Sequence, residues 1–178
     1  GSFVAVRLVI KDLSPLYLGF LRFLLAAPLM VLCTVVLKRP LFLPKKEFPH
    51  LLVLSLTGVT LLYVLQFFGV AYTSASTSSV LINTNVLFIS LFSVIFLKEQ
   101  FSRRKMIGVM LSFTGVVLVI YAQMTNETIL LAPLFLFGCL FVLLSAICWA
   151  VYSVFGKRLL ATYDPFTINA NVFVLGTV

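Results

Sequence analysis

Long apolar segments alternate with short polar connections along this chain. Five segments are long enough to cross a membrane and run roughly over residues 15–37, 51–72, 76–97, 106–122 and 134–155. A helix needs about 20 mainly apolar residues to cross about 30 Å of hydrocarbon, so each segment predicts a spanning helix. Two further apolar segments, residues 1–11 and 165–178, reach a chain end before completing that length. The pattern predicts an all-α integral membrane protein: a multi-helix bundle truncated to about seven spans, from a longer protein.

The composition supports a chain that faces lipid. Hydrophobic residues make up 62% of the 178 residues and charged residues 10%, which is more apolar material than a soluble core of this size buries. The formal net charge of +8 would suggest a nucleic-acid partner in a soluble protein. Here the basic residues gather between apolar segments, so we expect the lipid bilayer as partner and no nucleic acid.

The connections between the segments differ in charge. Ten of the thirteen basic residues fall in three connections, "LKRPLFLPKKEFPH", "KEQFSRRK" and "GKRLLATYD". These alternate with connections nearly free of bases, "KDLS", "YTSAS" and "QMTNETILLAP". Because basic connections stay on the cytoplasmic side, the alternation predicts a multi-pass protein with its basic loops in the cytoplasm, most simply in the cell membrane.

The two ends of the chain resemble each other at an offset of 150 residues. The aligned pairs are Ser14-Pro15 with Asp164-Pro165, Arg7 with Lys157, and Phe23 with Phe173. Five helices lie between equivalent positions, and this odd number reverses the direction in which the second copy enters the membrane. The sequence therefore predicts a first repeat over residues 1–122 and the start of a second, inverted repeat over residues 134–178. Inverted repeats are typical of secondary transporters, whose substrate sites lie near the midplane between repeats.

The stretch "AYTSASTSSVLINTNVLFISLFSVIFLKEQFSRRKMIGVMLSFTGVVLVIY", residues 71–121, resembles the fourth and fifth helices of the EamA-type branch of the drug/metabolite transporter superfamily. "SPLYLGFLRFLLAAP" and "CWAVYSVFGK" are similar to that family's second and sixth helices. The resemblance covers nearly the whole chain. It implies ten helices in two inverted five-helix repeats, of which the last three and the start of the first are absent here.

The chain departs from the family pattern in the fourth helix. Members often carry Glu-Pro where this chain has Asn85-Val86, and the family's Gly-Glu turn is Lys98-Glu99 here. Without the proline we expect no kink at this point. Without the glutamate an ionisable group that could carry a proton is missing, and all five carboxylates lie at or outside predicted helix ends. The sequence thus does not determine whether transport is coupled to protons. It does not determine whether the protein forms a homodimer either.

Arg22 is a candidate for substrate binding because it lies inside a predicted span, where a charge is costly. The family resemblance places an Arg-Phe pair there in many members. Two interpretations remain: Arg22 snorkels outward or pairs with helix-end carbonyls, or it holds an anionic group of a substrate.

Other polar residues share helix faces. With the incomplete segment over residues 1–11 counted as the first span, Tyr63 and Gln66 lie on one face of the third span, where the Gln66 amide needs a partner. On the fourth span Ser79 and Asn83 share a face, and Asn85 points about 200° away from Asn83, so we expect the Ser79/Asn83 face to line the cavity. On the sixth span Trp149 and Tyr152 belong to a stripe with Ser145 and Gly156; Trp149 is either a cavity wall or a packed aromatic. Gly108, Ser112 and Gly115 are expected to mediate helix packing.

Several classes of function lack support in the sequence. No His-Glu pair, nucleophile-base arrangement or Gly-rich phosphate loop occurs, so we expect no enzyme. The three cysteines lack metal-binding spacing, and we expect neither a metal nor a cofactor. The sequence predicts a secondary transporter of small amphipathic metabolites that works by alternating access. Export and an amino-acid-like substrate are implied by the resemblance; the alternative is a non-transporting membrane receptor or scaffold.

Overall fold

The computed structural model describes residues 6, 14–98, 102–124 and 132–177. Regular structure within these ranges is helical throughout, without strands. Residues 1–11, expected to form the end of the first span, lie outside the described residues except for residue 6. The helices are α2 Pro15–Val36, η1 Lys45–Glu47, α3 Phe48–Ser55, η2 Leu56–Thr60, α4 Leu61–Tyr72, α5 Ala75–Ile82, α6 Asn85–Leu97, α7 Arg103–Met124, α8 Ala132–Leu160 and α9 Pro165–Thr177.

Within the described residues, five stretches are long and apolar enough to cross a membrane. They are Leu16–Val36, Lys45–Tyr72, Ala75–Leu97, Arg103–Ala122 and Pro133–Leu160. Each coincides with one of the five segments predicted from the sequence, so the all-α membrane fold is confirmed. The shorter α9 adds a further helix beside them.

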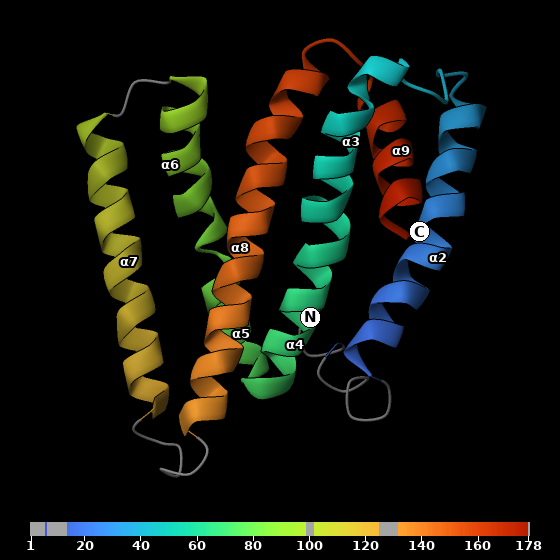
Figure 1. The fold of residues 1–178 in the computed structure, drawn as a ribbon. Helices are drawn as coiled ribbons and strands as arrows, with labels where there is room; N and C mark the ends of the chain where they lie inside the picture. Colours follow the sequence, from blue (N-terminus) through green and yellow to red (C-terminus); the bar gives the residue numbers. More distant parts are fainter. Residues whose placement is uncertain (1–5, 7–13, 99–101, 125–131, 178) are drawn as a thin grey trace.

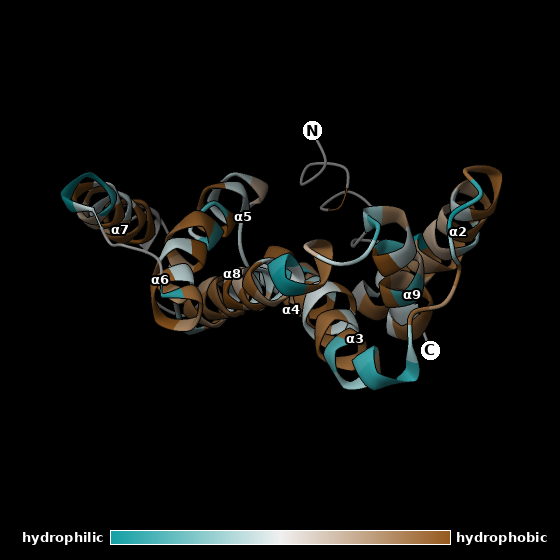
Figure 2. Ribbon diagram, turned by 90° about the horizontal axis from the view of Figure 1, so that it is seen from above, coloured by the Kyte–Doolittle hydropathy of each residue, from teal (hydrophilic) through white to brown (hydrophobic). Residues whose placement is uncertain are grey.

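The helices stand side by side in a curved row (Figures 1 and 2). α7 lies at one end of the row and α2 at the other, with α8 and the α3–η2–α4 span between them (Figure 2). α8 packs against α4 on one side and against α6 on the other, and α2 packs on α9. The C-terminal ends of α2, α6 and α8, after which the three basic connections begin, lie on the same side of the bundle, the top of Figure 1. We call this the basic end.

The central span is not a uniform α-helix. η2 is a π-helical stretch, in which the N–H of Leu61 bonds to the carbonyl of Leu56. Gly58 lies in this stretch against the ring of Tyr152 on α8, where a Cβ would collide with the ring. Such π stretches are often found at functional sites. Here it marks the point where the central span meets α8 and, through Thr60, α9.

Glycines bring α4 and α8 close together. A Cβ on Gly69 would lie 2.5 Å from Cγ2 of Val142, and one on Gly138 would lie 2.6 Å from Cγ2 of Thr73. Small residues at such crossings let membrane helices approach closely. The expectation that Gly108 and Gly115 do this on α7 is wrong for the described part of the chain, because neither has an atom within 4 Å of an added Cβ.

The fourth span is interrupted between α5 and α6 although it has no proline. The N–H groups of Asn83 and Thr84 bond three residues back, to Val80 (3.2 Å) and Leu81 (3.0 Å). The Thr84 hydroxyl also donates to the Leu81 carbonyl (2.7 Å), and Asn83 Nδ2 donates to the Ser79 carbonyl (2.6 Å). Side-chain hydrogen bonds thus replace part of the i→i−4 backbone hydrogen bonding of the helix, and this can interrupt a helix without a proline. We expected no kink where the family's proline is missing; the structure divides the span into α5 and α6 just before that position.

Candidate functional site

Aromatic rings from α2, α4 and α9 meet near the middle of α2. Phe23 packs edge-on against Tyr63, with ring centroids 4.9 Å apart, and against Phe173, at 5.6 Å. Tyr63 also contacts Phe67, at 5.8 Å. We call these four residues the aromatic cluster. Phe23 and Phe67 are buried, while Tyr63 and Phe173 are half-buried.

Arg22 lies over the aromatic cluster. Its guanidinium carbon is 4.7 Å from the centroid of the Tyr63 ring, a cation–π arrangement that contributes about 0.5–2 kcal/mol. Among the described residues no carboxylate lies within ion-pair distance of Arg22, and no helix-end carbonyl accepts a hydrogen bond from it. The side chain is exposed in the described part of the protein. The guanidinium is therefore held in place by a ring and keeps its N–H donors available.

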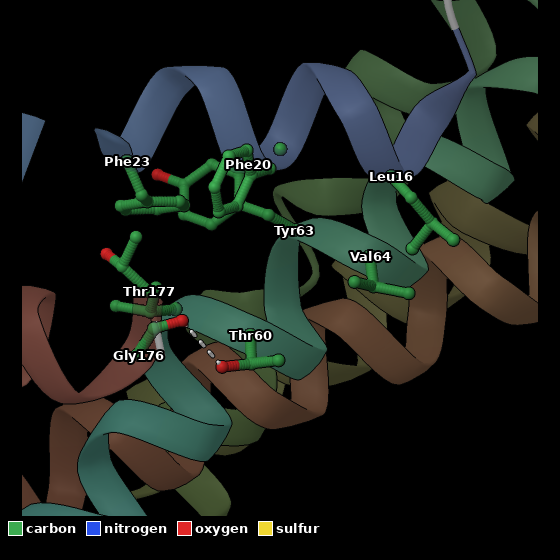
Figure 3. A pocket seen from close by; sticks show the side chains of 10 residues that line it. Leu16, Phe20, Phe23, Thr60, Tyr63, Val64, Gly176 and Thr177 are labelled. Atoms are coloured by element: carbon green, nitrogen blue, oxygen red, sulfur yellow. Dashed lines mark hydrogen bonds between the residues drawn. The ribbon is translucent and has the colours of Figure 1, made fainter. Parts of the chain in front are cut away.

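A cavity of about 200 Å³ adjoins the cluster (Figure 3). Its polar groups are few: the hydroxyls of Thr60, Tyr63 and Thr177 lie among apolar walls. The Thr60 hydroxyl donates to the Gly176 carbonyl at 3.1 Å and joins the central span to α9. An apolar wall with a few placed polar groups is typical of small-molecule sites, although those usually exceed about 300 Å³. The lining residues are Leu16, Gly19, Phe20, Phe23, Val59, Thr60, Tyr63, Val64, Gly176 and Thr177.

Trp149 and Tyr152 form a second aromatic pair on α8, with ring centroids 5.4 Å apart. The Tyr152 hydroxyl donates to Oδ1 of Asn169 on α9 at 3.0 Å. Tyr152 also lines a cavity of about 240 Å³ together with Asn169 and Gly156. Tyr63 and Tyr152 both pack against the same buried apolar cluster, which includes Val59. The two tyrosines therefore flank the π-helical stretch.

The remaining candidates bond locally or have no hydrogen bond. Ser79 donates to the Ser76 carbonyl at 2.8 Å, and Asn83 is exposed with its amide nitrogen bonded to Ser79. Gln66 is half-buried, and its amide forms no hydrogen bond with the described part of the chain. Asn85 is half-buried as well.

Six of the seven residues chosen from the sequence lie in three pairs. These are Arg22 with Tyr63, Trp149 with Tyr152, and Ser79 with Asn83. The described contacts do not gather all seven residues in one cavity. Sequence reasoning missed Phe173 as a contact residue. The offset of 150 residues that aligns Phe23 with Phe173 was a signal for it, because residues related by a two-fold axis can meet on it.

Known proteins resemble this chain along its whole length. The sequence model of the EamA-like transporter family matches residues 1–121 and 136–178. The chain belongs to the EamA-like transporter family. An uncharacterized transporter of Archaeoglobus fulgidus is 42% identical over the whole chain, and a second from that organism is 30% identical over 99% of it. The uncharacterized transporter YyaM of Bacillus subtilis is 28% identical over the whole chain. No solved structure matches the chain.

The EamA-like chain spans about three fifths of the length of these relatives: 60% of each Archaeoglobus protein and 58% of YyaM. The match to the family model and the similar transporters confirm the resemblance to the drug/metabolite transporter superfamily. Family and relatives point to a membrane transporter rather than an enzyme.

Proposed function

We propose that the whole EamA-like protein is a secondary transporter that exports small amphipathic metabolites by alternating access of two inverted five-helix repeats. The observation that carries the proposal is the contact between Phe23 and Phe173, with Arg22 and Tyr63 beside it. These two phenylalanines are equivalent positions of the predicted repeats. A contact between them near mid-helix is what a two-fold axis between the repeats would produce, and transporter sites lie on such axes.

The side chains favour a substrate with one anionic group and an apolar body. Arg22 offers guanidinium donors to a carboxylate, and the aromatic cluster offers apolar surface next to it. Gln66 adds an amide without a hydrogen-bond partner in the described part of the chain. An amino-acid-like substrate fits this chemistry best. The proposed substrate-binding residues are Arg22, Tyr63, Gln66, Ser79, Asn83, Trp149 and Tyr152.

We place the protein in the cell membrane with its basic end in the cytoplasm. Support comes from the C-terminal ends of α2, α6 and α8, after which the three basic connections begin and which lie on the same side of the bundle (Figure 1). With this orientation, the predicted first span runs outward and α2 runs inward.

Flux through proteoliposomes made with the whole protein tests the proposal. The panel comprises radiolabelled amino acids, a nucleobase and a cationic dye. We expect at least one amino acid to equilibrate faster than in protein-free liposomes, and Gln66→Ala or Asn83→Ala to slow it. Binding of a panel compound without any flux would favour the receptor alternative. If nothing moves and both variants bind like the wild type, the transporter and its site are wrong.

A further inference from the structure

Polar contacts join the two predicted repeats at the basic end. After α2 ends, the chain runs alongside the first turns of α9 (Figure 1). Arg39 Nε lies 3.6 Å from Oδ2 of Asp164, the residue that precedes α9. The hydroxyl of Thr167 donates to the Pro40 carbonyl at 2.7 Å, and Nδ2 of Asn171 donates to the Leu41 carbonyl at 2.7 Å. Residues 39–41 belong to the first predicted repeat, and residues 164–171 to the second.

Several of the groups that make these contacts are buried. Thr167 is 2% exposed, and the Asp164 side chain is 19% exposed against 57% for Arg39. Oδ2 of Asp164 is buried and accepts no hydrogen bond from the described residues. Arg39 is accordingly the cation that compensates this carboxylate in the described part of the chain. A carboxylate left buried without its cation would be costly, so separation of the repeats here must rehydrate Asp164.

A further contact between α2 and α9 lies next to this group. Thr34 on α2 is fully buried, and its hydroxyl lies 3.4 Å from the Phe166 carbonyl of α9 while donating to Met30 at 2.8 Å. Thr34 therefore sits directly behind the loop contacts, on the surface where α2 meets α9. It becomes accessible to water only if the two helices separate at this end.

The corresponding positions of the first predicted repeat carry other side chains. At the offset of 150 residues, Asp164 corresponds to Ser14, Thr167 to Tyr17 and Asn171 to Leu21. A serine, a tyrosine and a leucine provide no carboxylate for an ion pair and no amide at the third position. An inverted repeat would otherwise close its two ends in the same way. The corresponding positions of the first repeat therefore do not provide the groups that make the contacts at the basic end.

We propose that Arg39, Asp164, Thr167 and Asn171 form a latch between the repeats, which keeps the basic end closed and biases the resting transporter towards opening at the other end. The latch rests on the proposed function, since it is a gate only in a protein that transports. In each cycle Arg39 and Asp164 separate and both become hydrated. The two hydrogen bonds to loop carbonyls are exchanged for bonds to water at the same time.

The test measures how fast the basic end opens. The whole protein carries Thr34→Cys as reporter, with Cys33, Cys139, Cys148 and any cysteine outside this sequence replaced by alanine, in sonicated membrane fragments. A charged methanethiosulfonate reagent then reaches both faces, and its rate of reaction with residue 34 reports the open fraction. Asp164→Asn removes the charge but keeps a residue suited to start α9. We expect it to speed the reaction about two- to fivefold, as loss of a partly exposed ion pair implies.

Arg39→Gln should speed the reaction more than Asp164→Asn, because it leaves the buried carboxylate without its cation. The matched control for Asp164→Asn is Glu47→Gln, which removes a negative charge at the same end, from a carboxylate that lies 3.3 Å from His50 within the first repeat. Its rate should equal that of the reference protein. The exchanged pair Arg39→Asp with Asp164→Arg should restore slow labelling, which a merely structural defect would not allow.

The latch is wrong if Asp164→Asn and Arg39→Gln label no faster than Glu47→Gln, or if the exchanged pair stays fast. Should Arg39→Gln fail to fold, Asp164→Asn and the exchanged pair still decide. Thiol labelling needs no cargo, so the outcome is independent of the flux experiment. Fast labelling without flux of any panel compound would show that these contacts hold the basic end closed, while contradicting the proposed transport.

Discussion

At the scale of single residues, the position of Arg22 sets the expected chemistry of the site. A guanidinium inside a span is costly unless something compensates it, and here the face of Tyr63 does so in part. The ring occupies one side of the guanidinium and leaves its N–H donors free for an anion. Tyr63 in turn is fixed by Phe23 and Phe67. The charge is therefore held in one place before a substrate arrives, which lowers the ordering cost of binding.

Arg22→Gln should lower the flux of an anionic or zwitterionic panel compound about tenfold or more, the loss expected for one charge-assisted hydrogen bond. Arg22→Lys should retain part of the flux, because it keeps the charge but not the planar fork. Initial rates in proteoliposomes, normalised to the amount of reconstituted protein, measure both. Arg103→Gln, the same change in an exposed base at the start of α7, should leave the flux unaltered. Wild-type flux in Arg22→Gln would mean that Arg22 only packs on the ring.

At the scale of helices, the contact between α4 and α8 depends on two glycines. A Cβ at position 69 would lie 3.0 Å from the backbone nitrogen of Val142 and 3.1 Å from the carbonyl oxygen of Gly138, and neither backbone atom can rotate away. Gly69→Ala should therefore destabilise the protein by about 1–3 kcal/mol, the usual cost of overpacking. A lower thermal denaturation midpoint in detergent measures this.

Gly108→Ala on α7 is the matched control, because nothing lies within 4 Å of a Cβ at that position. The substitution should be neutral or stabilise the helix by up to about 1 kcal/mol. Equal midpoints for the Gly69 and Gly108 variants would contradict the packing described for α4 and α8.

The helical spans could be predicted from the sequence, whereas the contacts between them could not. The five spans were predictable because their length and polarity are local properties of the chain. The break at Asn83 and Thr84 was not, since hydrogen bonds from these side chains to the backbone make it and no proline signals it. The pairs Arg39–Asp164 and Tyr152–Asn169 depend on the rotation and register of packed helices. A single sequence determines neither, so it could propose candidate residues but not the residues that they contact.

At the scale of the whole molecule, two of the contacts between α2 and α9 should behave differently during transport. The helices run antiparallel, with Phe23 next to Phe173 near mid-helix and Thr34 next to Phe166 towards the basic end. If the repeats rock about an axis at the phenylalanine contact, distances there change little in the cycle. Distances at the latch, farther from the axis, must grow when the basic end opens.

Two cysteine pairs separate these roles. In a cysteine-free whole protein, Phe23→Cys with Phe173→Cys is linked by a short bifunctional methanethiosulfonate, and Arg39→Cys with Asp164→Cys is linked likewise. We expect the link at the latch to stop flux of a transported panel compound, because it prevents the opening of the basic end, and dithiothreitol to restore the flux. The mid-helix link should leave most of the flux that the unlinked double variant retains. Equal inhibition by both links would place the axis elsewhere, and continued flux through the linked latch would show that the basic end opens without separating α2 from α9.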